Sequence, residues 1–152
     1  MSPRPLVLLL LLAFALSTAP IALARKARVV EMTGNDQMKF SVTTITAKPG
    51  ETLTVRLKSI GTLPKIAMAH NFVLLAAGTD AAAFANAAAT SASTGYIPAA
   101  QKDRVLAMTG LAGPGETVEV TFTAPAKPGQ YEYICSFPGH FVAGMKGVLV
   151  VK

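Results

Sequence analysis

Short stretches of alternating apolar and polar residues, separated by Pro-Gly pairs, most constrain the fold of this chain. Two stretches alternate strictly, and their apolar residues are Leu53, Val55 and Leu57, then Val118, Val120 and Phe122. A period of two residues is that of a strand with one buried face. Pro-Gly pairs, which are typical of tight turns, lie in segments 48–51, 114–116 and 127–130. Short strands separated by such turns predict an all-β, antiparallel sandwich or barrel.

Three further segments have the length and composition of strands. Residues 70–75 end in four apolar residues, 147–152 contain the run Val-Leu-Val-Val, and 131–135 place Tyr131, Tyr133 and Cys135 on one face. Residues 80–89 break the pattern because they are rich in alanine, and Thr79 or Asp80 can act as the N-cap. We therefore expect a short helical excursion between two strands.

The first 24 residues have the pattern of a secretory signal peptide. Arg4 precedes an apolar run over residues 6–16, and Ala22 and Ala24 form a small-x-small cleavage site. An uncleaved membrane anchor is the alternative, but the apolar run is shorter than the roughly 20 residues that span a bilayer. We predict cleavage after Ala24, export to the periplasm or the medium, and one mature domain over residues 25–152.

The charge of the chain does not indicate a nucleic-acid partner. The formal net charge is +6, but the basic residues are scattered apart from Arg25, Lys26 and Arg28. Basic and aromatic residues are not interleaved as in nucleic-acid-binding segments. We interpret these charges as an ordinary solvated surface and expect a monomer without a nucleic-acid partner.

Cys135 is the only cysteine, so the chain cannot form an intramolecular disulfide. Exported proteins usually carry paired cysteines. A lone cysteine in such a protein is an inert core residue, an intermolecular link or a chemically used thiol. A used thiol needs protection from oxidation, and binding to a metal would provide it.

Cys135 begins a regular array of three metal-binding residue types. His140 and Met145 follow at intervals of five residues, and the only other histidine is His70. Two imidazoles, one thiolate and a weak thioether are the ligands of a blue-copper electron-transfer site. Each residue has a simpler explanation, because a buried cysteine, a core histidine and a gap-filling methionine are all common. The four together favour copper ligation.

Several segments together resemble the small blue copper proteins of the azurin and auracyanin group, in the cupredoxin family. The resemblance extends over nearly all of residues 25–152, and it is clearest in the segments 34–38, 63–65, 68–71, 135–140 and 145–147. It implies a Greek-key β-sandwich or barrel that holds one type 1 copper ion. His70, Cys135 and His140 would be the equatorial ligands and Met145 the axial ligand.

The resemblance also assigns roles around these ligands. The Ala69 carbonyl would lie opposite Met145, and the backbone N–H groups of Asn71 and Phe137 would donate to the ligand sulfur. The Asn71 side chain and Ser136 would connect the two ligand segments. Such contacts orient ligands and tune the potential.

Four features depart from azurin. Arg28 and Gly50 stand where azurin has the cysteines of its disulfide, and Ala69 replaces a glycine. The loop between His140 and Met145 is one residue longer and matches auracyanin better. Phe72 stands where azurin has a buried tryptophan.

We predict that the chain carries single electrons between redox proteins and is not an enzyme. Partners would dock near the edge of His140, on an apolar patch formed by Met38, Leu63, Met68, Pro138, Phe141 and Val142. A copper carrier or storage protein is the alternative. A hydrolase with Cys135 as nucleophile and His140 as base is less favoured, because it leaves His70 and Met145 without a role.

Overall fold

The computed structural model describes residues 26–152, so the predicted signal peptide over residues 1–24 lies outside the described residues. The strands of this part of the chain are β1 (Arg28–Gly34), β2 (Thr44–Ala47), β3 (Thr52–Ser59), β4 (Val73–Leu75), β5 (Val105–Met108), β6 (Thr117–Thr123), β7 (Gly129–Ile134) and β8 (Lys146–Val151). One α-helix, α1 (Ala81–Ala88), and two short 3-10 helices, Ala92–Thr94 and Ala99–Arg104, lie between β4 and β5. Within residues 26–152, no helix is long and apolar enough to cross a membrane.

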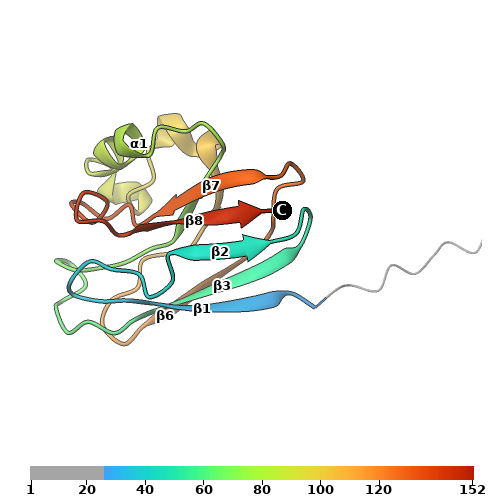
Figure 1. Ribbon diagram of the computed structural model, residues 1–152. Helices are drawn as coiled ribbons and strands as arrows, with labels where there is room; N and C mark the ends of the chain where they lie inside the picture. The colour runs from blue at the N-terminus through green and yellow to red at the C-terminus, as the bar shows by residue number, and fades with distance from the viewer. Residues whose placement is uncertain (1–25) are drawn as a thin grey trace, which may run out of the picture.

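The strands form two sheets that pack face to face (Figure 1). One sheet has the strand order β1-β3-β6, and the other has the order β2-β8-β7-β4-β5. The two strictly alternating stretches are β3 and β6, which pair with each other. Leu53, Val55 and Leu57 are fully buried between the sheets, which confirms the buried face predicted from the alternation. The predicted β-sandwich is therefore correct.

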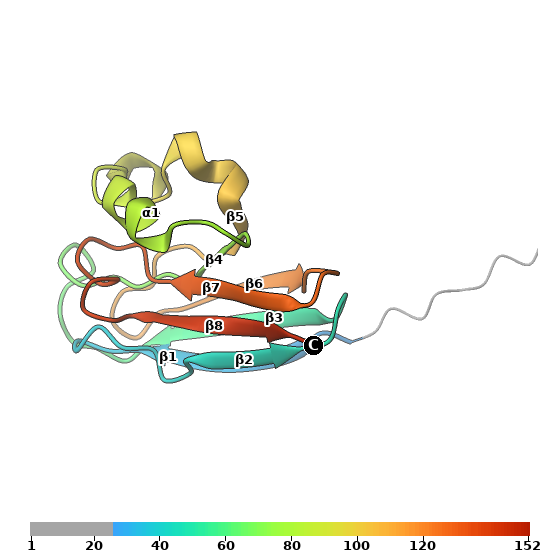
Figure 2. The same cartoon turned by 45° about the horizontal axis from the view of Figure 1, so that its top comes forward.

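A helical layer covers the outer face of the five-stranded sheet (Figure 2). Phe84 of α1 packs with Val73, Leu75 and Ile134 in a small apolar cluster that is separate from the core between the sheets. Asp80 caps the helix, because its Oδ1 accepts hydrogen bonds from the N–H groups of Ala82 and Ala83, both at 3.0 Å. The predicted helical excursion and one of its two proposed caps are thus confirmed.

The prediction of antiparallel pairing holds for only part of the fold. β1 runs parallel to β3, and β2 runs parallel to β8. After β1 the chain forms β2 in the other sheet and then returns as β3. A crossover of this kind joins parallel strands, whereas a hairpin joins antiparallel ones. Alternation along a strand shows which face is buried but not which strand lies beside it.

The segment 70–75 is a strand over only half of its predicted length. β4 begins at Val73, and His70 makes an isolated pair of backbone hydrogen bonds with Ala112. The backbone before Val73 is not part of the β4 strand, so the His70 side chain is free to turn toward the end of the sandwich. The sequence interpretation also missed β1, β2, β5 and the 3-10 helices. β2 and β5 are only four residues long, and the adjacent residues Val29 and Val30 interrupt the alternation of β1.

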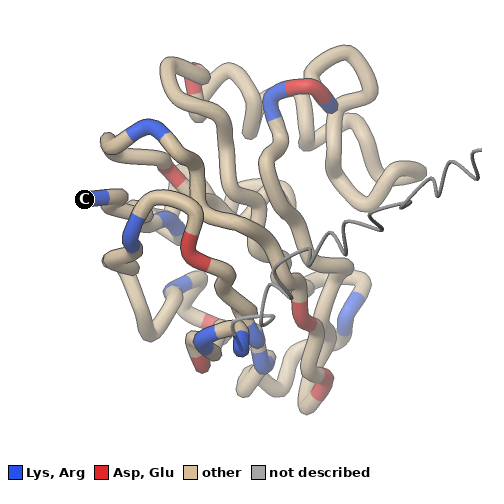
Figure 3. Tube along the Cα trace, turned by 90° about the vertical axis from the view of Figure 1, so that its right-hand side faces the viewer, with Lys and Arg blue, Asp and Glu red and all other residues tan. Residues whose placement is uncertain are grey.

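Charged residues of both signs are spread over the end of the sandwich where the C-terminus lies (Figure 3). Arg28 at this end donates a hydrogen bond to Glu51 at 2.7 Å and another to the Thr46 carbonyl at 2.6 Å. Glu51 follows Gly50, so an exposed ion pair joins the two segments that the resemblance to azurin would join by a disulfide. A pair of this kind stabilises a fold by ~0–1 kcal/mol.

Candidate metal centre

The first candidate ligand, His70, lies in the irregular segment before β4. The His70 N–H donates to the Ala112 carbonyl at 3.0 Å, and the Ala112 N–H donates back to the His70 carbonyl at 2.8 Å. This bridge fixes the backbone on both sides of the side chain. The imidazole itself is fully buried.

The other three candidate ligands lie on the loop between β7 and β8. Cys135 follows the last residue of β7, and its N–H donates to the Met145 carbonyl at 3.0 Å. The Met145 N–H donates to the His140 carbonyl at 2.9 Å, and the His140 N–H to the Phe137 carbonyl at 3.1 Å. Gly139 has φ = 82°, a left-handed conformation that glycine adopts without strain. This turn carries the chain back, so that His140 lies beside Cys135.

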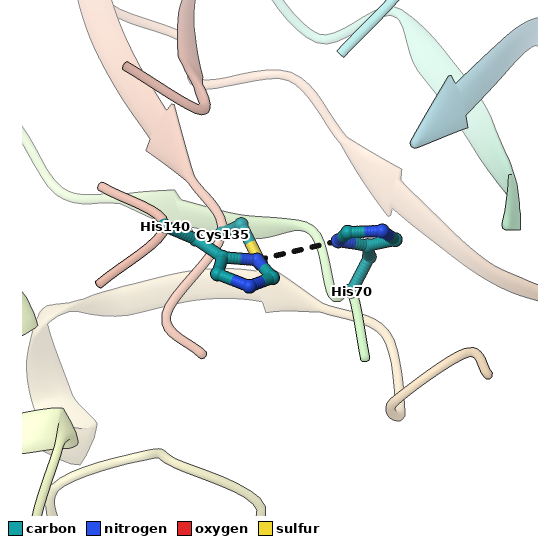
Figure 4. A group of neighbouring side chains, drawn as sticks. All are labelled: His70, Cys135 and His140. Atoms are coloured by element: carbon teal, nitrogen blue, oxygen red, sulfur yellow. Dashed lines mark hydrogen bonds between the residues drawn. The ribbon is translucent and has the colours of Figure 1, made fainter. Parts of the chain in front are cut away.

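The side chains of His70, Cys135 and His140 bring their donor atoms together in one buried cluster (Figure 4). The Nδ1 atoms of His70 and His140 are 3.3 Å apart, and the Cys135 Sγ is 3.4 Å from Nδ1 of His140. Ligand atoms that bind one metal at about 2.0–2.3 Å are separated from each other by roughly 3.3–4 Å. One nitrogen from each histidine and the sulfur all lie within 4.8 Å of one another, so the donor set fits a single ion with little rearrangement.

Met145 lies near His70 in the structure. Both residues are fully buried, and both side chains pack against Gly34 at the end of β1. A Cβ atom at Gly34 would lie 2.9 Å from the Cδ2 atom of His70 and 2.9 Å from the methyl carbon of Met145. Only a glycine leaves room here for both side chains, a requirement that the sequence interpretation missed.

Hydrogen bonds from neighbouring residues hold the two ligand segments together. The Asn71 side chain accepts a bond from the Ser136 N–H at 2.9 Å and donates one to the Ser136 hydroxyl at 2.9 Å. The backbone N–H groups of Asn71 and Phe137 bond to the Cys135 sulfur, and the Ala69 carbonyl oxygen is 4.0 Å from it. These contacts are those that the resemblance implies for Asn71, Phe137 and Ser136. The Ala69 carbonyl stays 4.0 Å from the sulfur, although alanine replaces the glycine of azurin.

Burial governs the protonation of the copper-free site. It lowers the pKa of His70, and it lowers the pKa of His140 to about 4 with a contribution from the neighbouring His70. Burial also raises the pKa of the Cys135 thiol to about 12, although the two backbone N–H donors act in the opposite direction. At neutral pH the copper-free site therefore holds two neutral imidazoles and a neutral thiol. Binding of a metal displaces the thiol proton.

Of the aromatic residues near the site, Phe72 was expected from the sequence and Tyr96 was not. Phe72 is fully buried and packs on Tyr133 with ring centroids 5.0 Å apart, which fits a residue in the place of a buried tryptophan. Phe137 contacts both His140 and Tyr96, with ring centroids 4.9 Å apart in each case. No sequence pattern pointed to Tyr96, because it lies on an irregular segment that is distant in the chain from the ligand loop.

Comparison with known proteins decides the family. A sequence model of the family described as "Copper binding proteins, plastocyanin/azurin family" matches residues 27–152. The chain belongs to this family. The cluster of His70, Cys135 and His140, with Met145 beside it, is the type 1 copper site expected of a member.

Azurins and auracyanins are among the similar members of the family. An azurin of Pseudomonas denitrificans is 41% identical over 126 residues, a match that covers 81% of this chain and 97% of that protein. Auracyanin-B of Chloroflexus aurantiacus is 41% identical over 117 residues, which cover 76% of this chain. The match spans only 48% of auracyanin-B, about half of its length.

Solved structures of auracyanins have the same fold as this chain. Reduced auracyanin from Roseiflexus castenholzii superposes with a TM-score of 0.73 at 32% identity, covering 83% of this chain and 98% of that structure. Auracyanin A of Chloroflexus aurantiacus gives 0.71 at 39% identity, covering 82% and 98%. Members of this family with a His-Cys-His-Met site are electron carriers, so the predicted function, copper cofactor and absence of enzymatic activity are confirmed.

Proposed function

We propose that this cupredoxin carries single electrons between redox proteins outside the cytoplasm, with His70, Cys135 and His140 as main copper ligands and Met145 as the weak axial ligand. The observation that carries the proposal is the buried cluster of two imidazole nitrogens and one sulfur within 4.8 Å of one another. Copper, when bound, supplies a one-electron couple between Cu(I) and Cu(II), both of which accept this mixture of donors.

The protein contributes a rigid and dry environment. The backbone bridge at His70 and the three backbone hydrogen bonds at Cys135, His140 and Met145 fix the positions of the ligands. Exposure of these four side chains to water is 1% or less. Ligands that are already in place need little movement when the charge of the site changes, which favours fast electron transfer.

Apolar side chains near the ligand loop form the proposed docking surface. Val142 is 82% exposed and Leu63 is 45% exposed, and Ile66, which the sequence interpretation did not include, is 88% exposed. Phe141 instead packs partly into the cluster beneath α1, and Lys146 lies 4.7 Å above its ring. Large apolar side chains that stay exposed around a functional site are typical of an interaction surface.

His140 itself is only 1% exposed, so its ring is not an open contact surface. A partner would touch the side chains around the ring, and the electron would pass through them to the His140 imidazole. Docking near His140 therefore remains the proposal, but with the apolar side chains as the contact.

Storage or carriage of copper is less well supported. A carrier must release its metal, whereas these ligands are buried and joined by reciprocal hydrogen bonds across two segments. A hydrolase is not supported either, because burial raises the pKa of Cys135 to about 12 and excludes a substrate from the thiol.

Voltammetry of the copper-loaded protein, combined with copper transfer to a chelator, tests the proposal. An electron carrier should show a reversible one-electron couple and retain its copper in both oxidation states. Rapid loss of copper from the reduced protein would instead indicate a carrier.

The docking surface has its own test. Val142→Asp should slow electron exchange between two molecules of this protein at high salt, because exchange requires contact near the site. Leu106→Asp is the matched control, since Leu106 on β5 is 44% exposed and lies outside the ligand loops. Equal rates for both variants would contradict the assignment of the surface.

Export is also part of the proposal. Cleavage after Ala24 would give a mature protein that begins at Arg25, as the small residues at positions 22 and 24 predict. Mass spectrometry of exported protein tests this. A mature protein that retained residues 6–16 would support a membrane anchor.

A further inference from the structure

Lys39 joins the turn after β1 to the ligand loop, although the two segments lie far apart in the chain. Its Nζ atom donates a hydrogen bond to the carbonyl oxygen of Ala143, 104 residues later. Nζ also lies close to Gly144, since a Cβ atom at Gly144 would be 2.9 Å from it. Ala143 and Gly144 lie between the candidate ligands His140 and Met145, so the ammonium group of Lys39 contacts the middle of the ligand loop.

The turn that carries Lys39 is held by hydrogen bonds to Asn35. Oδ1 of Asn35 accepts a bond from the Lys39 N–H at 3.1 Å, and the Asn35 carbonyl accepts one from the Met38 N–H at 2.9 Å. Gly34, at the start of this turn, packs against the Met145 side chain. The turn therefore contacts the ligand loop at two points, once at its end and once in its middle.

The backbone bonds near Ala143 stay within the ligand loop. The Ala143 N–H donates to the Gly139 carbonyl at 3.0 Å, and the Gly144 N–H donates to the Phe141 carbonyl at 2.9 Å. Gly144 has φ = 94°, in the left-handed region, and glycine has more backbone freedom than any other residue. The bond from Lys39 differs from these bonds because it reaches the loop from another part of the fold.

Copper can leave the site only when part of the protein moves away from it. The four candidate ligands are 1% exposed or less, and three of them lie on the ligand loop. Val142, in the same loop, is 82% exposed, so the loop lies between the site and the solvent. Local opening is easiest where a segment has few contacts with the rest of the structure. A bond from a charged donor is stronger than a neutral one, so its loss should favour the open loop.

We propose that Lys39 is a positioning residue that holds the ligand loop closed over the metal centre and thereby slows the loss of copper. This inference rests on the proposed function, because it requires His140 and Met145 to be copper ligands. The bond lies at an exposed side chain, where water competes for both partners, so the effect is modest. A loop that stays closed suits an electron-transfer protein better than a protein that delivers copper.

Amide hydrogen exchange of the copper-free Lys39→Met variant, followed by NMR, tests whether the bond holds the loop. Methionine keeps most of the length of the side chain but removes the donor and the charge. We expect the N–H groups of Gly144 and Met145 to exchange at least threefold faster than in the wild type. The Ala89 N–H, which bonds to the Ala85 carbonyl at the end of α1, should exchange at an unchanged rate, because that helix end opens separately.

Transfer of copper from the reduced, copper-loaded protein to a chelator tests the consequence for the metal. We expect Lys39→Met to lose its copper at least threefold faster than the wild type does. This measurement requires copper in the site, whereas amide exchange does not.

Two control variants separate the bond from other effects of the substitution. Lys58→Met removes the same charge from an exposed residue of β3, and it should match the wild type in both measurements. Lys39→Arg keeps a charged donor on a long side chain, so both of its rates should lie closer to those of the wild type than to those of Lys39→Met.

Equal rates for Lys39→Met and the wild type in either measurement overturn the inference. An increase in Lys58→Met or Lys39→Arg as large as that in Lys39→Met also overturns it. Failure of the proposed function would look different, because the wild-type protein would then lack the thiolate-to-copper absorption band.

Discussion

Asn71 and Ser136 exchange two hydrogen bonds of 2.9 Å across the two ligand-bearing segments, although they lie 65 residues apart in the chain. Asn71 follows His70, and Ser136 follows Cys135. Each bond therefore fixes a residue next to a ligand. The contact therefore connects the two halves of the metal centre.

Asn71→Ala should destabilise the copper-free protein. It leaves the buried Ser136 N–H without an acceptor, so we expect the free energy of unfolding to fall by about 1–3 kcal/mol. Ser136→Ala is the matched variant, because it keeps the bond from the Ser136 N–H to Asn71 and loses only the hydroxyl. Urea unfolding of both proteins measures the difference, and a smaller loss for Asn71→Ala than for Ser136→Ala would contradict this account.

Gly34→Ala should disturb the copper site directly. The added Cβ would lie 2.9 Å from both the His70 ring and the Met145 methyl group, so both side chains must shift. We expect a changed visible spectrum and a loss of stability of roughly 1–3 kcal/mol from overpacking. Gly110→Ala is the control, because a Cβ there meets no atom within 4 Å. Identical spectra for the wild type and Gly34→Ala would show that His70 and Met145 do not pack tightly against residue 34.

Met145→Leu should retain the blue colour and raise the reduction potential. Leucine keeps most of the volume, and swaps of this kind usually cost less than ~1.5 kcal/mol of stability. Loss of a soft donor to an apolar side chain favours the reduced ion, which tolerates fewer ligands. Voltammetry compares the two proteins. An unchanged potential would place Met145 away from the metal, and complete loss of copper would make it a main ligand.

The copper-free protein should lose stability as the pH falls from 7 to 5. The pKa values of His70 and His140 are lowered in the folded state, so the unfolded chain binds more protons below its ordinary histidine pKa of about 6.5. Stability is thus full above that pH and declines toward the folded pKa. We expect a loss of roughly 1–3 kcal/mol in this interval.

Between pH 7 and 5, the change in the free energy of unfolding comes from the histidines and not from the carboxylates. The lowered pKa values of Asp36, Glu51 and Glu116 remove stability only as the pH falls below about 4.5. His140→Gln should therefore give a flatter profile than the wild type. A copper-free wild type whose unfolding free energy did not fall between pH 7 and 5 would contradict the burial of the two rings.

The sequence predicted those parts of the fold that local patterns encode. The alternation in β3 identified its buried face, and Asp80 began the helix because its side chain can satisfy free N–H groups. The parallel pairing of β1 with β3 has no local signature, because it depends on the path of the chain through the other sheet. β4 was predicted too long because apolar residues continue on both sides of the point where its pairing begins.

The ligands were accessible to sequence reasoning because their chemistry is rare in this chain. The chain has one cysteine and two histidines, so only a few sets of metal ligands are possible. The roles of Gly34 and Ile66 were not accessible in the same way. Gly34 matters because the Met145 methyl group, distant in the chain, packs against it, and Ile66 matters because the fold leaves its side chain 88% exposed.

The central claim is that Cys135 is the thiolate ligand of a type 1 copper centre. The visible absorption spectrum of the oxidised, copper-loaded protein, measured beside that of Cys135→Ser, tests it most directly. Serine is close to cysteine in volume, so circular dichroism should show that the variant is folded. We predict a strong thiolate-to-copper band toward the red end of the spectrum in the wild type and its complete loss in Cys135→Ser. A band that survives in the folded variant, or a copper-loaded wild type without one, would contradict the account.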